Sequence, residues 1–211
     1  MKYVPVHSVG NAIATCLLLL FYNIESQAQL GIPEPTDYRN ALYPFAVGNS
    51  WTYAESTVFL TGTRVDTFER SIFHFQWENS QPQWIFDNAE VFTQHGDSIF
   101  LIQPTRWPGK NVLTLEYLRP SSKDTATFSS STAGGDVAFI KTAVLLKDVF
   151  STPCGEFDSC IVFHYDVFDD HISEVLCPRI GIVAIDDYTD STATHSAFVA
   201  KRRLIEFKLK K

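Results

Sequence analysis

Histidine and aspartate side chains lie close together in the sequence at three places, where they could serve as acid–base groups or metal ligands. These places are His95-Gly96-Asp97, His164 with Asp166, and Asp169-Asp170-His171. None of them has the ligand spacing of a zinc motif or lies in an EF-hand-like loop. We therefore interpret them as turn residues and solvated strand positions, and the sequence predicts no metal site and no catalytic residue among them.

An acidic stretch after an apolar run offers a second candidate for chemistry. Asp186, Asp187 and Asp190 supply hard oxygen ligands of the kind that calcium prefers. The alternative, which we favour, is an exposed acidic loop that ends a strand. The chain also lacks a Gly-x-Ser-x-Gly elbow, a phosphate-binding loop and a dinucleotide fingerprint, so the sequence predicts no cofactor.

The N-terminal residues have the three regions of a cleavable signal peptide. Lys2 opens the segment, an apolar run covers Ala12 to Tyr22, and Ser26-Gln27-Ala28 places small residues where a signal peptidase reads them. We expect cleavage after residue 28, which leaves residues 29–211 as a single β domain that is secreted or periplasmic, with no membrane span. Cys16 lies inside the apolar run rather than after it, so a lipid-modified cysteine is the less favoured alternative.

Composition limits the partners of the chain. Its 211 residues suffice for one domain with its own core, and the formal net charge of −7 argues against non-specific nucleic-acid binding. Aromatic residues make up 14% of the chain and favour β-strands. The C-terminal segment is locally basic through Lys201-Arg202-Arg203. We interpret these cations as residues that protect the edge of a sheet from pairing with another sheet.

Residues alternate between apolar and polar along several segments, which is the pattern of half-buried strands. The strongest example is 64–78, where Phe73, Phe75 and Trp77 share one predicted face. Further strands are expected at 50–60, 84–86, 89–93, 98–102, 112–118, 139–150, 161–167, 172–176, 182–185 and 197–209, with polar loops at 121–124 and 129–135. We expect roughly eight to eleven strands in an all-β, mostly antiparallel, strongly curved sheet or barrel, with a β-sandwich as the alternative.

Two motifs resemble a class of uncharacterised secreted β-rich bacterial proteins. Pro153 to Cys160 fits Pro-x-Gly-x-Phe-x-x-Cys, and Gly48 to Tyr53 fits Gly-Asn-x-Trp-x-Tyr. The segment Cys177-Pro-Arg-Ile-Gly-Ile-Val183 is similar to a Pro-Gly-x-Gly-like segment of those proteins, with Arg179 in place of the first glycine. The resemblance covers about 40 residues and implies an exported β-rich architecture, without implying a reaction.

Three cysteines remain after the predicted signal segment, so one bridge leaves one thiol unpaired. In the resembling proteins a cysteine at the position of Cys160 commonly has no evident partner. Cys154 and Cys177 lie beside turn residues, and a hairpin turning at Asp169-Asp170 would place Cys177 opposite about residue 162. We therefore predict a Cys154–Cys177 disulfide with Cys160 free and buried, and keep Cys160–Cys177 as the alternative.

Two classes of function fit these observations. The first is a non-catalytic exported β domain that binds an apolar or polymeric ligand, or that assists assembly of the cell envelope. The second is a hydrolase whose site is built from distant loops. The absence of a catalytic motif favours the first class. The shape of the sheet should discriminate the two, because carriage of a ligand needs a cavity and hydrolysis needs converging reactive groups.

Overall fold

The protein is built from β-strands throughout the part that its structure describes. A computed structural model describes residues 34, 41–59, 62–104, 111–121, 124–131, 138–168, 170–191 and 195–210. These residues contain fourteen strands and no helix. The strands are β1 (Ser50–Phe59), β2 (Gly62–Glu78), β3 (Gln81–Phe86), β4 (Val91–His95), β5 (Ser98–Pro104), β6 (Asn111–Leu118), β7 (Thr125–Ser131), β8 (Ala138–Leu145), β9 (Phe150–Thr152), β10 (Gly155–Phe157), β11 (Ile161–Val167), β12 (Asp170–Cys177), β13 (Gly181–Ser191) and β14 (His195–Lys208).

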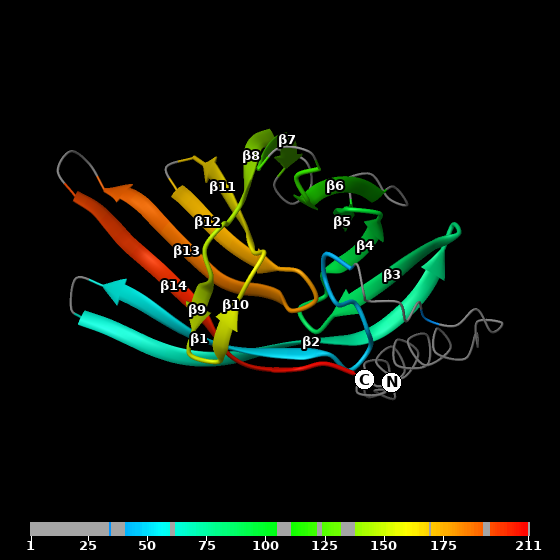
Figure 1. The fold of residues 1–211 in the computed structure, drawn as a ribbon, viewed down its shortest axis with the longest axis horizontal. Helices are drawn as coiled ribbons and strands as arrows, with labels where there is room; N and C mark the ends of the chain where they lie inside the picture. The colour runs from blue at the N-terminus through cyan, green and yellow to red at the C-terminus, as the bar shows by residue number, and fades with distance from the viewer. Residues whose placement is uncertain are drawn as a thin grey trace, which may run out of the picture. The chain divides into compact units, whose positions relative to one another are not determined.

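Twelve strands form one curved antiparallel sheet, as the sequence predicts. Their order is β6-β5-β4-β3-β2-β1-β14-β13-β12-β11-β8-β7, and β9 and β10 form a separate hairpin. The sheet curls so far that its two edge strands, β6 and β7, come together (Figure 1). Side chains join these edges: Thr114 Oγ1 lies 3.1 Å from Ser131 Oγ, and Ser130 Oγ donates to Glu116 Oε1 at 3.5 Å. We call this junction the β6–β7 seam. The curved-sheet prediction is confirmed.

The Gly48–Tyr53 motif and the Cys177–Val183 segment pack against each other in the core. Gly181 has a φ of +101°, and a Cβ at this position would meet the Tyr43 ring at 3.0 Å and Trp51 Nε1 at 3.2 Å. Trp51 Nε1 donates to the carbonyl of Ile180 at 2.5 Å, and Tyr53 Oη donates to the carbonyl of Ile182 at 2.9 Å. Only glycine satisfies both the backbone conformation and the close approach at residue 181. These motif residues therefore build the core.

The alternation along β2 is interrupted by a bulge. The pairing of β2 with β3 shifts between Ile72 and His74, so Phe73 is the extra residue. Ile72 is buried and Phe73 is 60% exposed, while Phe75 packs against Trp84 with ring centroids 5.5 Å apart. The prediction that Phe73, Phe75 and Trp77 share one face is wrong for Phe73, because a bulge places two consecutive residues opposite one partner.

Four other expectations about the strands are corrected. The structure has more strands than the eight to eleven expected. β7 includes residues 129–131, which were expected to belong to the polar loop 129–135. β13 continues through Asp186 and Asp187 to Ser191, because these residues pair with both β12 and β14. Finally, β14 lies between β1 and β13, so Lys201-Arg202-Arg203 does not protect an edge. Instead Arg202 pairs with Glu55, and Arg203 binds both carboxylate oxygens of Asp186 at 2.6 and 2.8 Å.

The disulfide prediction is also corrected. The structure joins Cys160 to Cys177 with an S–S distance of 2.01 Å, and Cys154 is free and partly exposed. The reason is the register of the β11–β12 hairpin, in which Ile161 lies opposite Leu176 and Val167 opposite Asp170. Because Val167 pairs with Asp170, the hairpin turns between these two residues, one position earlier than expected. This shift moves the residue opposite Cys177 from about 162 to Cys160, the alternative partner.

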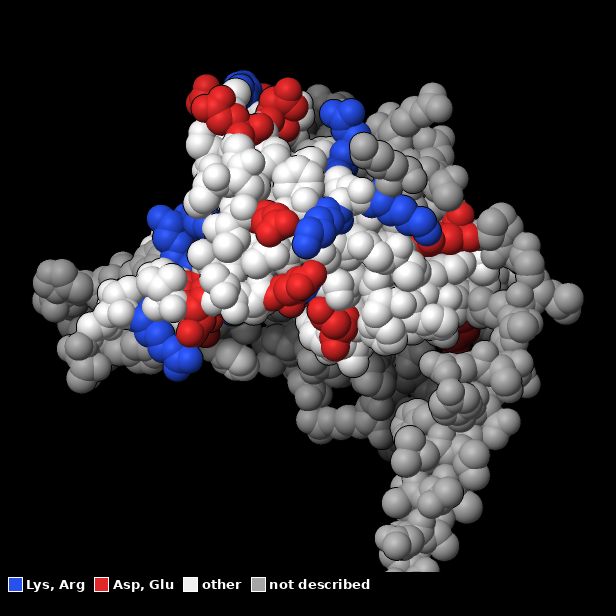
Figure 2. Space-filling model, turned by 90° about the horizontal axis from the view of Figure 1, so that it is seen from below, with Lys and Arg blue, Asp and Glu red and all other residues white. Residues whose placement is uncertain are grey.

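The surface carries charges of both signs. On the face shown in Figure 2, Lys and Arg side chains are interspersed with Asp and Glu side chains, with uncharged surface between them. Within the described ranges no helix is long and apolar enough to cross a membrane. The compact unit that carries all fourteen strands spans Glu34–Lys211, and the predicted signal segment 1–28 lies outside the described residues.

Candidate ligand-binding cavity

The inner face of the curved sheet holds a cavity of about 250 Å³. We call it the inner cavity. Its wall combines aromatic and aliphatic side chains with six polar or charged ones. The lining residues are Tyr53, Phe68, Arg70, Asn88, Glu90, Phe92, Leu101, Glu116, Tyr117, Glu174, Ile182, Ile185 and Arg202. They come from β1, β2, β4, β5, β6, β12, β13 and β14, together with the turn between β3 and β4.

Strand register explains why residues so distant in sequence meet here. Glu174 lies opposite Ile185, Ile185 lies opposite Arg202, and Arg202 lies opposite Glu55. Residues directly opposite one another in antiparallel strands project from the same face. The three ladders therefore place one row of side chains across β12, β13, β14 and β1, and the curvature of the sheet turns this row toward β6.

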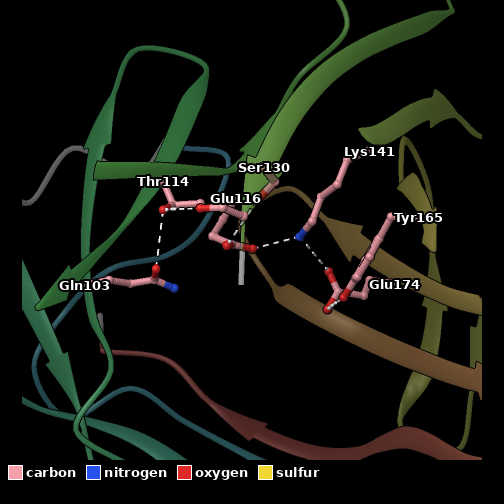
Figure 3. Close-up of polar contacts among 8 residues, drawn as sticks. Gln103, Thr114, Glu116, Ser130, Lys141, Tyr165 and Glu174 are labelled. Atoms are coloured by element: carbon pink, nitrogen blue, oxygen red, sulfur yellow. Dashed lines mark hydrogen bonds and ion pairs between the residues drawn. The ribbon is translucent and has the colours of Figure 1, made fainter. Parts of the chain in front are cut away.

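A buried lysine lies beside the cavity at the β6–β7 seam (Figure 3). Lys141 is 1% exposed, and its Nζ lies 2.7 Å from Glu116 Oε2 and 3.7 Å from Glu174 Oε2. Aromatic rings surround the ammonium, with the Tyr165 and Tyr117 centroids 4.3 and 5.1 Å away. Cation–π contact and two carboxylates compensate for the loss of water around this charge. Lys141 thereby connects β8 to β6 and β12.

Burial changes the proton affinity of the groups around Lys141. It raises the pKa of Glu116 above its ordinary value of 4.5, and the positive charge and hydrogen bond of Lys141 oppose this effect. Burial also raises the pKa of Tyr165, and the nearby Glu174 carboxylate adds to the increase. The Tyr165 hydroxyl therefore stays protonated and donates to Glu174 Oε1 at 3.0 Å. Two carboxylates of the cavity wall, Glu116 and Glu174, thus accept hydrogen bonds from an ammonium and a phenol that lie outside the lining.

An arginine occupies the opposite part of the wall. Arg70 forms an ion pair with Glu90, and its guanidinium lies 4.3 Å from the centroid of Phe86. Its Nε has no hydrogen-bond partner although it is buried, and Glu174 Oε2 is in the same condition, since Lys141 Nζ lies beyond hydrogen-bond distance. Buried polar atoms normally have partners. Two residues of the lining, Arg70 and Glu174, therefore each carry one buried polar atom without a hydrogen-bond partner.

The residues singled out in the sequence lie elsewhere. His95-Gly96-Asp97 forms the turn between β4 and β5, with Gly96 at a φ of 57°. His164 is exposed on β11, and Asp166 contacts His171 across the β11–β12 hairpin at 2.5 Å in a solvent-exposed position. No group of three or more potential ligands among the described residues could hold a metal ion. The absence of a metal site remains a prediction for the whole chain.

Sequence reasoning missed the residues that do come together. Lys141 and Glu174 each lie between apolar residues two positions away on either side, where the period-two pattern expects an inward residue. Glu116 differs, because the alternation of Leu113, Leu115 and Tyr117 predicts it to face outward. It is the extra residue of a bulge in β6, where Ile99 pairs with Tyr117 and Phe100 with Leu115. A charge at an inward strand position is costly unless it is paired. That mismatch was the available signal, because it implies partners of opposite charge on neighbouring strands.

Comparison with known proteins gives only distant similarities. No protein-family model and no curated protein matches the sequence. A candidate lipoprotein from Parabacteroides distasonis has a solved structure with a TM-score of 0.47 and 12% identity, covering 80% of this chain and 99% of that one. A candidate exported protein with a YmcC-like fold from Bacteroides fragilis gives a TM-score of 0.44 and 12% identity, again covering 80% and 99% of the two chains. Similarity at this level assigns no function.

Proposed function

We propose that this protein is an exported, non-catalytic β domain that binds a small ligand in the inner cavity. The observation that carries the proposal is the cavity itself, a space of about 250 Å³ whose lining combines aromatic and aliphatic side chains with six polar or charged ones. Ligand sites are concave, mostly apolar and carry a few polar groups that fix orientation. The inner cavity has this composition.

The chemistry of the wall favours binding over covalent catalysis. Among the described lining residues there is no serine, threonine, cysteine, histidine or lysine. The hydroxyl, thiol, imidazole and amine nucleophiles of these residue types are therefore absent from the described lining, which leaves carboxylates and phenols. The free Cys154 lies outside the lining and hydrogen-bonds with Thr152, which belongs to the β9–β10 hairpin.

Export is supported by two independent features. The first is the signal-peptide pattern of residues 1–28. The second is the Cys160–Cys177 bridge, since disulfides persist mainly in oxidising compartments. Sequencing of the N-terminus of the mature protein should find Gln29 or a neighbouring residue as the first. A mature protein that retains Met1 would contradict export by this route.

Filling the cavity tests the binding proposal. Ile185→Phe adds volume to the cavity wall, whereas Ile140→Phe changes an isoleucine on β8 that is 58% exposed and does not line the cavity. We expect a library of small apolar, hydroxylated and charged fragments to shift NMR signals of lining residues in the wild type and in Ile140→Phe, and to shift none of them in Ile185→Phe. Circular dichroism should show the same β fold for all three proteins.

A second candidate, a glycoside hydrolase, is favoured by one observation. Glu116 and Glu174 face the same cavity, and the pKa of Glu116 is raised, as is required of a general acid. Against it, Lys141 and Tyr165 already hydrogen-bond with these carboxylates. Incubation with p-nitrophenyl glycosides decides between the two: release of nitrophenol that is lost in Glu116→Gln would establish the hydrolase, and no release supports a binding domain.

A further inference from the structure

The charged side chains of the inner cavity lie in ion pairs. Arg70 pairs with Glu90, Arg202 pairs with Glu55, and Lys141 lies between Glu116 and Glu174. The three cations of these pairs face four carboxylates, so none of them is left over for an anionic ligand. An anion would have to lose water without gaining a counter-charge, which is costly in a buried site. The ion pairs therefore disfavour an anionic ligand, and a neutral ligand avoids this cost.

The polar side chains of the lining suit a ligand that both donates and accepts hydrogen bonds. The lining holds the guanidinium groups of Arg70 and Arg202, which donate, and the carboxylate of Glu174, which accepts. Asn88, which is exposed at the rim, adds an amide with both capacities. A hydroxyl group both donates and accepts hydrogen bonds, so a ligand with several hydroxyls can pair with the donors and the acceptors of the lining.

The remaining wall consists of rings and aliphatic groups. Tyr53 and Phe68 stack with centroids 5.3 Å apart on neighbouring strands, and Tyr117 and Phe92 belong to the same lining. Aromatic side chains offer broad apolar surfaces for the C–H face of a saturated ring. The volume of about 250 Å³ is below the roughly 300–1,000 Å³ of sites that hold drug-sized ligands. One six-membered ring is the size that fits.

From these features we infer that the inner cavity binds a neutral polyhydroxylated ring, either a free monosaccharide or the terminal residue of a saccharide chain. This inference rests on the proposed function and adds the class of ligand to it. The hydroxyls face Glu174 and Arg70, and the C–H face of the ring lies against Phe68 and Tyr53.

Calorimetric titration with matched sugars tests the inference. The probes are the neutral methyl glycosides of glucose, galactose and N-acetylglucosamine. The comparison ligands are glucuronate and glucosamine, which keep the ring and add a negative or positive charge, and cyclohexanol, which keeps the ring and one hydroxyl. We expect at least one neutral glycoside to bind at least about tenfold more tightly than all three comparison ligands, since a lost hydrogen bond or an unpaired charge costs that much or more.

Two phenylalanines on β2 form a matched pair for the same titration. Phe68 lines the cavity, whereas Phe73 is 60% exposed and does not. Phe68→Leu keeps an apolar side chain and removes the ring, so we expect about fivefold weaker binding of the glycoside, and no change for Phe73→Leu. Both side chains are more than a third exposed, so both variants should fold, as circular dichroism can confirm.

The possible failures are distinguishable. If no glycoside binds, or if cyclohexanol or a charged sugar binds as tightly as the best glycoside, the inference is wrong. An equal loss in Phe68→Leu and Phe73→Leu would also overturn it, because the sugar would then bind elsewhere. The proposed function stands in each of these cases as long as the fragment library still shifts the lining residues and Ile185→Phe abolishes the shifts.

Discussion

At the scale of single residues, the structure depends on a lysine that the sequence would not suggest as a core residue. Lys141 is buried between two carboxylates and several aromatic rings. Removing one partner of a buried ion pair leaves an uncompensated buried charge, which costs about 3–5 kcal/mol. The ammonium is therefore needed chiefly because Glu116 and Glu174 are there.

We predict that Lys141→Met lowers the free energy of unfolding by about 3–5 kcal/mol, measured by urea denaturation at pH 7. Lys147→Met is the control, because Lys147 is exposed and pairs with Asp124 at the surface, and its unfolding midpoint should match the wild type. The triple variant Lys141→Met, Glu116→Gln, Glu174→Gln should recover part of the loss. Equal midpoints for Lys141→Met and the wild type would contradict this role.

A second prediction concerns pH. The pKa of Glu116 is raised in the folded protein above its ordinary value of 4.5. Between pH 4.5 and the raised pKa, Glu116 is therefore more often protonated in the folded state than in the unfolded state. The contribution of Glu116 to stability is therefore greatest below pH 4.5 and declines as pH rises through the raised pKa. The difference in unfolding free energy between the wild type and Glu116→Gln should decrease from pH 4.5 to pH 7. An increase over this range would show that the pKa is lowered instead.

At the scale of elements, the register of one hairpin fixes the disulfide. Because β11 and β12 pair Ile161 with Leu176, the next pair outward is Cys160 with Cys177. We predict that non-reducing peptide mapping recovers a Cys160–Cys177 peptide.

Replacing both Cys160 and Cys177 by alanine should lower the free energy of unfolding by about 3 kcal/mol, because the disulfide that closes a short loop is lost. Cys154→Ala should cost less than about 1 kcal/mol, since Cys154 is unpaired. A Cys154–Cys177 peptide would refute the register.

The β6–β7 seam makes a prediction about local stability. Side chains, rather than a backbone ladder, join the two edges. Amides that point into the seam should therefore exchange hydrogen faster than the amides of β1 and β14, which are paired on both sides. Hydrogen-exchange NMR measures the difference directly. Equal protection of the amides of β6, β7 and β14 from exchange would contradict this prediction, because the seam would then open no more often than the backbone-paired strands.

Much of the element structure could be predicted from the sequence, for physical reasons. Period-two alternation depends only on which face of a strand is buried, so β2, β11 and the end of β14 were found from residue types alone. The bulge at Phe73 and the turn between Val167 and Asp170 could not be found this way, because both depend on how neighbouring strands pair. A shift of one position in the turn was enough to exchange Cys154 for Cys160 as the partner of Cys177.

The candidate site was less predictable than the fold. Glu116, Lys141 and Glu174 are separated by tens of residues and meet only because the sheet curls until β6 approaches β8 and β12. The charges of Lys141 and Glu174 at inward positions were a visible signal in the sequence, whereas Glu116 faces inward only because of a bulge. The partners of each charge, and the cavity beside them, follow from curvature and strand order, which alternation does not encode.

At the scale of the whole molecule, the curved sheet acts as a frame that surrounds a small polar and aromatic space. Eight of the twelve strands supply lining residues, and ion pairs offset all but one of the charges around that space without filling it. The central claim is that this space holds a small ligand in the exported protein.

Native mass spectrometry of the protein purified from its own cell envelope tests the claim most directly. The wild type should carry an added mass of a few hundred daltons or less, as expected for one small ring in a site below about 300 Å³. Ile185→Phe, purified in the same way, should lack it, and Ile140→Phe should retain it. A wild-type spectrum without added mass, or one in which Ile185→Phe keeps the same ligand, would contradict the account.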